Sequence, residues 1–174
     1  MRAELRIPRT LHTEVLRDLR RGHPFAYERV GFLFGRLSQM EGGNALILVN
    51  RYHSIPDEQY VRDSTVGARI GEEAIAYGME QAHYGAAVHE GLFHVHLHDG
   101  RGPTGMSSTD QRELPALIPG FRSMGKTAAH GIVILSADHG TAWIWIPGRK
   151  ESVVADRIAV VGAPLSIFEG RSVW

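Results

Sequence analysis

The chain has 174 residues, of which 43% are hydrophobic and 22% charged, a balance typical of one soluble globular domain. Its 19 basic and 19 acidic side chains cancel, which argues against binding to nucleic acid or to an anionic membrane. It has no cysteine, which excludes disulfides, thiolate metal sites and a cysteine nucleophile, so any metal must be held by nitrogen and oxygen ligands.

The N-terminal segment predicts a short strand followed by an amphipathic helix. The stretch ELRIP, at 4–8, is typical of a strand. Leu11, Val15 and Leu19 then recur at helical spacing, which predicts a helix that Pro24 ends. No apolar run has the length of a signal peptide or of a membrane span, so we expect a cytoplasmic protein.

Two strands are predicted next, followed by a third, shorter one. Apolar and aromatic residues from Val30 to Leu37 predict a buried strand. The sequence EGG, at 41–43, predicts a turn before another strand over 44–55. The segment 58–63 predicts a short edge strand.

A long helix and a histidine-rich strand are expected in the middle of the chain. Ser64 or Thr65 can cap a helix that runs through about Tyr84. The apolar stripe of this helix consists of Val66, Ile70, Ala74 and Tyr77. The stretch AAVHEGLFHVHLH, at 86–98, then returns to the period of a strand, with its apolar residues facing away from its histidines.

The last part of the chain predicts a short helix and three strands. Ser107 or Ser108 can cap a helix that begins near Thr109 and stops around Pro115. Two strands joined at 138–140 follow, and the sequence DRIAVVG predicts a last strand. Because helices fall between strands, we expect an α/β or α+β fold with a mixed sheet sandwiched by helices, in a single domain over residues 1–174.

The histidine-rich strand suggests a metal site. His94, His96 and His98 occupy alternate positions, and alternate residues of a strand project from the same face. Zinc–nitrogen bonds are about 2.0–2.1 Å long, so neighbouring imidazoles on one face can share an ion. Asp110, at the predicted start of a helix, is a suitable third ligand. Two histidines and one carboxylate leave a fourth position for water, the arrangement of a catalytic zinc site.

Two further residues complete a possible hydrolytic site. Glu28 precedes the buried strand ERVGFLFG, where its carboxylate can take a proton from water and pass it to a leaving amine. Ser107 lies three residues before Asp110 and can donate to a developing oxyanion.

The order of these residues resembles the JAMM motif of the JAB/MPN metalloprotease family: a Glu on an early strand, His-x-His, a loop, then Ser-x-x-Asp. The likeness covers about residues 4–146 and is strongest to compact bacterial members. It implies a cytidine-deaminase-like fold, a Zn²⁺ cofactor, and hydrolysis of the bond after the C-terminus of a ubiquitin-like modifier. That reaction would release the modifier from its conjugates or process its precursor. The resemblance also implies E1- and E2-like enzymes as partners.

Two registers of the histidines fit the motif. If His96 and His98 are the ligands, eight residues separate the pair from Ser107, one more than the family pattern. If His94 and His96 are the ligands, ten residues intervene, but the sequence GLFHVH then matches the family's Gly-aromatic-aromatic-His-x-His. Loop spacing favours the first register, and His96 is a ligand in both.

Two other functions are compatible with the same residues. One is hydrolysis of an adduct of a sulfur-carrier protein, and the other is a catalytically inactive MPN scaffold that has lost the metal. Outside the motif, Trp143 and Trp145 are expected to be packing residues. The histidines without a spacing argument are interpreted as surface or loop residues: His53, His89, His130 and His139.

Overall fold

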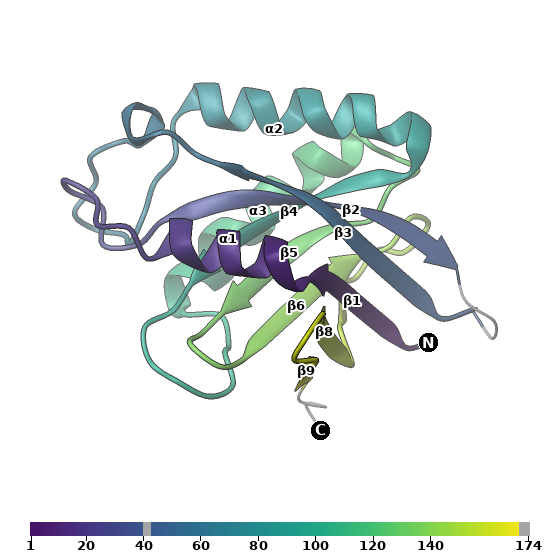
Figure 1. Cartoon of the computed structure of the whole chain (residues 1–174). Helices are drawn as coiled ribbons and strands as arrows, with labels where there is room; N and C mark the ends of the chain where they lie inside the picture. The colour runs from purple at the N-terminus through teal and green to yellow at the C-terminus, as the bar shows by residue number, and fades with distance from the viewer. Residues whose placement is uncertain (40–42, 171–174) are drawn as a thin grey trace.

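The computed structural model describes residues 1–39 and 43–170 and has a mixed α+β fold (Figure 1). Within these ranges the helices are α1 (Arg9–Leu19), α2 (Glu72–Gly85) and α3 (Ser108–Met124), with 3-10 turns η2 (Asp57–Gln59) and η3 (Ala86–Val88). The strands are β1 (Ala3–Pro8), β2 (Val30–Gln39), β3 (Ala45–Ser54), β4 (Glu90–Leu97), β5 (His130–Leu135), β6 (Gly140–Trp145), β7 (Val153–Val154), β8 (Arg157–Val161) and β9 (Ser166–Glu169). No helix in the described part of the chain is long and apolar enough to span a membrane.

The strands form one curled mixed sheet in the order β7-β6-β5-β4-β2-β3-β1-β8-β9. β4 lies inside the sheet, antiparallel to β2 and parallel to β5. The sheet curls so that two residues, Ala155 and Asp156, link β7 to β8: the N–H of Ala155 donates to the carbonyl of Ala142 on β6, and that of Asp156 to the carbonyl of Ala3 on β1, both at 2.8 Å. Because it lies between β2 and β5, β4, the strand that carries the histidines, is hydrogen-bonded along both sides.

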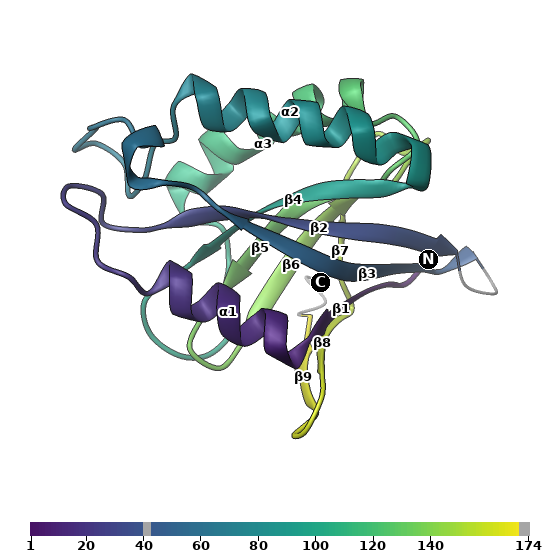
Figure 2. The ribbon, with the colours of Figure 1, turned by 45° about the horizontal axis from the view of Figure 1, so that its top comes forward.

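Helices cover both faces of the sheet, as Figures 1 and 2 show: α1 lies on one face, and α2 with α3 on the other. The core under α1 is closed by Val15 and Leu19, and the core on the opposite face by Leu114, Ile118 and Phe121 of α3. Burial of large apolar side chains, worth about 1.5–3 kcal/mol each, holds the helices in these positions.

β4 shows the predicted alternation of its two faces. Phe93 and Val95 point into the core under α1, as expected. His94 and His96, at the intervening positions, belong to the face covered by α2 and α3. Both are buried, with 4% and 1% of their surface exposed.

The strands at β1, β2, β3, β5 and β6 confirm the predictions for those segments. The EGG turn at 41–43 falls largely outside the described residues. The strand predicted over 156–162 appears as β8 but is not the last, because β9 pairs with it antiparallel. The predicted edge strand at 58–63 is wrong: the chain forms η2 and then a single bridge between Tyr60 and Ile70.

The three predicted helices exist, but their ends differ from the predictions. α1 ends at Leu19, well before Pro24, because the carbonyls of Arg21 and Gly22 accept hydrogen bonds from the buried Arg29. α3 does not stop near Pro115 but continues to Met124. Its buried apolar face outweighs the cost of two interior prolines, Pro115 and Pro119, at about 3 kcal/mol each.

α2 begins at Glu72, with Gly71 as N-cap, rather than at Ser64 or Thr65. The hydroxyl and N–H of Thr65 instead bind the Asp63 carboxylate, at 2.6 and 3.0 Å, which favours a turn over a helix. The acidic Glu72 and its neighbour then complement the dipole of the real N-terminus.

His130 also differs from its prediction, because it is fully buried rather than a surface residue. Its Nδ1 accepts from the N–H of Leu92 at 3.1 Å, and its Nε2 lies 2.9 Å from the carbonyl of Gly125. The imidazole is thus a structural link between β4, β5 and the end of α3.

Candidate metal centre

The end of β4 and the start of α3 bring three possible metal ligands together. His96 is the last histidine within β4, and His98 follows the strand directly, with its N–H still bonded to the carbonyl of Leu135 at 2.9 Å. Asp110 lies in the first turn of α3. These three residues form a group that could hold a metal ion, with one ligand atom from each lying within 4.8 Å of the others.

The spacing of the three ligand atoms fits a small ion. The Nε2 atoms of His96 and His98 are 3.0 Å apart. Nε2 of His98 lies 3.1 Å from Oδ2 of Asp110, and Nε2 of His96 lies 3.4 Å from Oδ1. Bonds of about 2.0–2.1 Å in a tetrahedral arrangement place neighbouring ligands roughly 3.3 Å apart. The side chains therefore point at one centre without rearrangement.

Asp110 is held in place by Ser107. Ser107 is the N-cap of α3, and its hydroxyl accepts from the N–H of Asp110 at 3.1 Å. The Oδ2 atom of Asp110 in return accepts from the N–H and the hydroxyl of Ser107, at 2.8 and 2.7 Å. This reciprocal capping box fixes the carboxylate that faces the histidines. The Ser107 hydroxyl, predicted as an oxyanion donor, is here engaged with Asp110.

The charges of the group favour an ionised carboxylate. Burial acts to raise the pKa of the Asp110 carboxyl, but the contacts with His96 and Ser107 outweigh it and hold the pKa well below its usual range. Asp110 is therefore negative at neutral pH, as a metal ligand must be.

His94 lies beside the group without joining it. Its ring centroid is 5.5 Å from that of His96, but the converging ligand set uses His96 and His98. Burial, followed by the charge of His96, lowers the pKa of His94 to about 3, so its ring is neutral at physiological pH. Its Nδ1 is buried and has no hydrogen-bond partner in the described part of the chain. The geometry thus agrees with the register that loop spacing favours.

His96 carries a further unsatisfied atom. Its Nδ1 is buried and, among the described residues, has no hydrogen-bond partner. A lone pair at Nε2 and a proton at Nδ1 is the tautomer that metal ligation requires. Ligation through Nε2 would leave this N–H unpaired, at a cost of roughly 1–3 kcal/mol that the bonds between the ion and its ligands must exceed.

Glu28 lies in the segment directly before β2, the strand that pairs with β4. Val30 is the cross-strand partner of His96, so Glu28, two residues earlier, precedes β2 beside the end of β4. The backbone N–H of Glu28 donates to the carbonyl of Gly67 at 3.1 Å. Its partly buried carboxylate lies against the same glycine and makes no hydrogen bond or ion pair with the described residues. Glu28 does not belong to the group of converging ligands.

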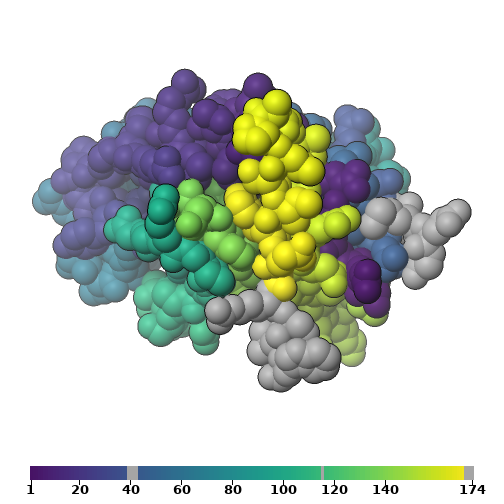
Figure 3. Space-filling model, turned by 60° about the horizontal axis from the view of Figure 1, so that its bottom comes forward, coloured from purple at the N-terminus to yellow at the C-terminus, as the bar shows by residue number. Residues whose placement is uncertain are grey.

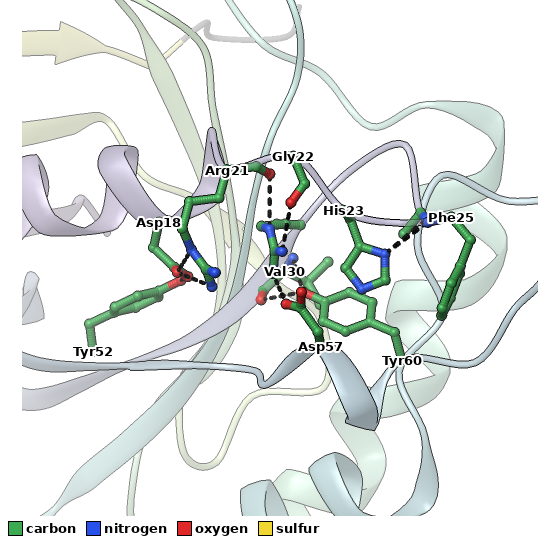
Figure 4. Close-up of polar contacts among 11 residues, drawn as sticks. Asp18, Arg21, Gly22, His23, Phe25, Val30, Tyr52, Asp57 and Tyr60 are labelled. Atoms are coloured by element: carbon green, nitrogen blue, oxygen red, sulfur yellow. Dashed lines mark hydrogen bonds and ion pairs between the residues drawn. The ribbon is translucent and has the colours of Figure 1, made fainter.

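A buried network holds the segment that carries Glu28 (Figure 4). Arg29 is 2% exposed, and its guanidinium donates to the carbonyls of Arg21 and Gly22 at 2.9 and 2.8 Å. Its third nitrogen lies 2.7 Å from the carboxylate of Asp57, as an ion pair that is not aligned as a hydrogen bond. The backbone on the N-terminal side of Glu28 is thereby fixed.

Tyr60 fixes the other side of Glu28. Its hydroxyl accepts from the N–H of Val30 at 3.0 Å and donates to the carbonyl of Val30 at 3.1 Å. Sequence reasoning missed Arg29, Tyr60 and Gly67. The one available signal was an arginine placed directly before an apolar strand, since such a cation can be buried only with partners.

A cavity of about 460 Å³ adjoins His94. It lies between the segment 63–70, α2, the start of β2 and α3. Its wall is mixed, with polar and apolar side chains in similar measure, and it includes the ion pair of Arg69 with Asp63 at 3.0 Å and that of Arg112 with Glu113 at 2.7 Å. The lining residues closest to the metal group in sequence or pairing are Val30, His94 and Arg112.

A comparison of the chain with protein-family models gives no match, and a comparison with curated proteins gives none. What the protein does must therefore be inferred from its own residues.

Proposed function

We propose that the protein is a zinc-dependent isopeptidase of the JAB/MPN type. It would hydrolyse the bond after the C-terminus of a ubiquitin-like modifier, in a conjugate or in a precursor. The observation that carries this proposal is the convergence of His96, His98 and Asp110 at the spacing of tetrahedral ligands, next to the strand that Glu28 precedes. The mixed sheet with helices on both faces is compatible with this fold family.

Zinc is the ion that these donors fit best. Two imidazoles and one carboxylate form an N₂O set in a chain without cysteine, and such sets with an open fourth position are typical of catalytic zinc. When bound, zinc lowers the pKa of its water to about 7 and polarises a carbonyl oxygen.

In this proposal Glu28 does the proton transfers. Its carboxylate, free of hydrogen bonds among the described residues, accepts a proton from the attacking water. It then delivers that proton to the nitrogen of the departing lysine or α-amine. Asp110 and the two histidines keep their positions throughout. The hydroxyl of Ser107, which donates to the Asp110 carboxylate in the structure, would turn from Asp110 toward the oxyanion.

The cavity beside His94 suggests where the modifier tail binds. The edges of the sheet are β7 and β9, and neither is adjacent to β4. We therefore expect the extended tail to lie in the cavity between segment 63–70 and α3, where both polar and apolar side chains line the wall, rather than along an edge of the main sheet. E1- and E2-like enzymes remain the expected partners in the same pathway.

Cleavage of defined substrates tests the proposal. Purified protein loaded with one equivalent of zinc is incubated with ubiquitin-like proteins joined through their C-termini to a lysine side chain or to a peptide, and separately with an adduct of a sulfur-carrier protein. Mass spectrometry should show hydrolysis after the terminal residue of the modifier, lost in Glu28→Gln. Cleavage of the sulfur-carrier adduct alone would show that this adduct, and not a ubiquitin-like conjugate, is the substrate. Stoichiometric zinc without any cleavage that depends on Glu28 would reject the enzyme and favour a scaffold.

A further inference from the structure

A second cavity, of about 760 Å³, lies on the face of the sheet that α1 covers, opposite the metal centre. Figure 3 looks onto this side, where N-terminal residues (purple) lie beside the C-terminal hairpin (yellow). The walls come from α1, β9 and the turn between β5 and β6. The lining residues that matter for its chemistry are Arg9, His12, Arg17, Arg20, Asp138 and Ser166.

The cavity carries a local excess of positive charge. Within the described residues, none of the three arginines that line it pairs with a carboxylate, whereas nine other arginines do: Arg6, Arg21, Arg29, Arg36, Arg51, Arg69, Arg101, Arg112 and Arg157. The one acidic residue in the wall, Asp138, is already engaged. It accepts from the N–H of Gly102 at 2.7 Å and lies 3.7 Å from Arg101. Three guanidinium groups thus remain uncompensated around one hollow.

Arg9 is already held in position. Its Nη2 donates to the carbonyl of Pro164 and to the hydroxyl of Ser166, both at 2.6 Å, which ties it to the hairpin of β8 and β9. Its Nε is buried and has no partner among the described residues. A guanidinium fixed in this way loses little conformational entropy when a ligand binds.

His12 supplies an independent observation. Only 7% of its surface is exposed, yet its ring forms no hydrogen bond in the described part of the chain, and it lines the cavity. Its one ring contact is with Phe168, at 6.1 Å between centroids. Its ring nitrogens are therefore available to a ligand in the cavity.

We propose that this cavity binds a phosphate-bearing small molecule of about nucleotide size. Arg9, Arg17 and Arg20 contact the phosphate oxygens, and His12 gives a further hydrogen bond. Arginine forks match phosphate oxygens in bidentate geometry, and charge-assisted bonds of this kind are about twice as strong as neutral ones. The hollow has the volume typical of small-molecule sites, about 300–1,000 Å³, which favours a small molecule over an acidic protein segment. This inference does not depend on the proposed isopeptidase activity.

Calorimetric titration of the zinc-loaded protein with inorganic pyrophosphate and with ATP tests the proposal. The test variant is Arg17→Gln with Arg20→Gln, two exposed positions on α1. The matched control is Arg149→Gln with Lys150→Gln, two exposed cations after β6 that give the same change of net charge. We expect the α1 variant to lose about tenfold or more in affinity and the control to stay within about twofold.

Four results would overturn the inference. Absence of binding to the unmodified protein is the first. Equal weakening in both variants would mean non-specific charge attraction, and no weakening in either would place the phosphate elsewhere, for example at the zinc. A peptide of glutamates that binds as tightly as pyrophosphate, and competes with it, would show that the cavity recognises negative charge and not phosphate. Perturbation of the His12 ring resonances by pyrophosphate would support the assigned position.

Discussion

The two parts of the candidate active site are built in different ways. The metal group takes its ligands from regular structure: His96 from β4, His98 from the residue after it, and Asp110 from the first turn of α3, with ligand atoms 3.0–3.4 Å apart. Glu28 belongs to an irregular segment, and its carboxylate touches Gly67 without a hydrogen bond in the described part of the chain.

Because of this difference, metal binding and the positioning of the base Glu28 depend on different sets of residues. The ligands follow from local geometry, since alternate residues of a strand share a face and a capping box orients the first-turn carboxylate. The position of Glu28 depends on contacts distant in sequence: Arg29 with Asp57, Val30 with Tyr60, and Glu28 itself with Gly67. Changes in the first part should alter metal content, and changes in the second should alter turnover alone.

The largest effect is expected from removing ligands. Asp110→Ala and His98→Ala should each lose zinc and with it all activity, because two remaining donors cannot hold the ion. His94→Ala should keep one equivalent of zinc, since His94 lies outside the converging set. Elemental analysis of the purified variants measures the outcome. Zinc retained in His98→Ala and lost in His94→Ala would assign the other register.

Glu28→Gln should have the next largest effect. The variant keeps zinc and the fold but loses the proton acceptor, so kcat should fall by about 10²–10⁴ at nearly constant KM. Single-turnover kinetics on the best modifier substrate provides the measurement. Near-normal turnover would show that another group takes the proton.

Gly67→Ala should have a smaller effect of the same kind. A Cβ at this position would lie 2.7 Å from Oε2 of Glu28, so the carboxylate must move. We expect kcat to fall by about 10- to 100-fold with zinc content unchanged. Gly22→Ala is the control, because a Cβ there meets no atom within 4 Å.

A double-mutant cycle distinguishes positioning from general damage. In the Glu28→Gln background, Gly67→Ala should lower kcat little further, because the carboxylate that it displaces is no longer present. Additive losses would mean that Gly67 acts through the fold. A crystal structure of Gly67→Ala with an unmoved Glu28 side chain would refute the positioning role while leaving the isopeptidase proposal intact.

The smallest expected effect is a pH dependence of stability. Arg29 holds the pKa of Asp57 below its usual value of 3.8. A carboxyl with a depressed folded pKa contributes stability that is complete above its unfolded pKa and is lost as the pH falls through the folded one. Asp57→Asn should therefore have a lower free energy of unfolding than the unmodified protein at pH 6, and the difference between the two should narrow below pH 4. Urea unfolding of the metal-free proteins measures it, and a gap independent of pH would exclude the ionic contribution.

Much of the fold could be predicted because its strands have clear period-two or continuous apolar patterns. β2 and β4 are examples, and the histidines of β4 appear on the face opposite Phe93 and Val95. Helix ends were harder to predict. Asp63 binds Thr65 in a turn before α2, which begins at Glu72, and Arg29 binds two carbonyls just beyond the end of α1. Hydrogen bonds of this kind produce no periodic pattern in the sequence.

The residues of the candidate site likewise differ in how well the sequence predicts them. His96, His98 and Asp110 could be predicted because strand alternation and a capping motif are local rules. The residues that hold Glu28 could not, since Tyr60 lies 30 positions from its partner Val30 and nothing in the intervening sequence marks the pairing. The cavity under α1 likewise joins residues from both ends of the chain, and it becomes visible only in the folded molecule.

A crystal structure of the zinc-soaked protein, with anomalous data collected at the zinc edge, tests the central claim most directly. We predict one strong peak about 2.0–2.2 Å from Nε2 of His96, Nε2 of His98 and a carboxylate oxygen of Asp110, with a vacant corner open to solvent. A peak at another place, or none at full zinc saturation, would contradict the proposed centre and the hydrolysis built on it.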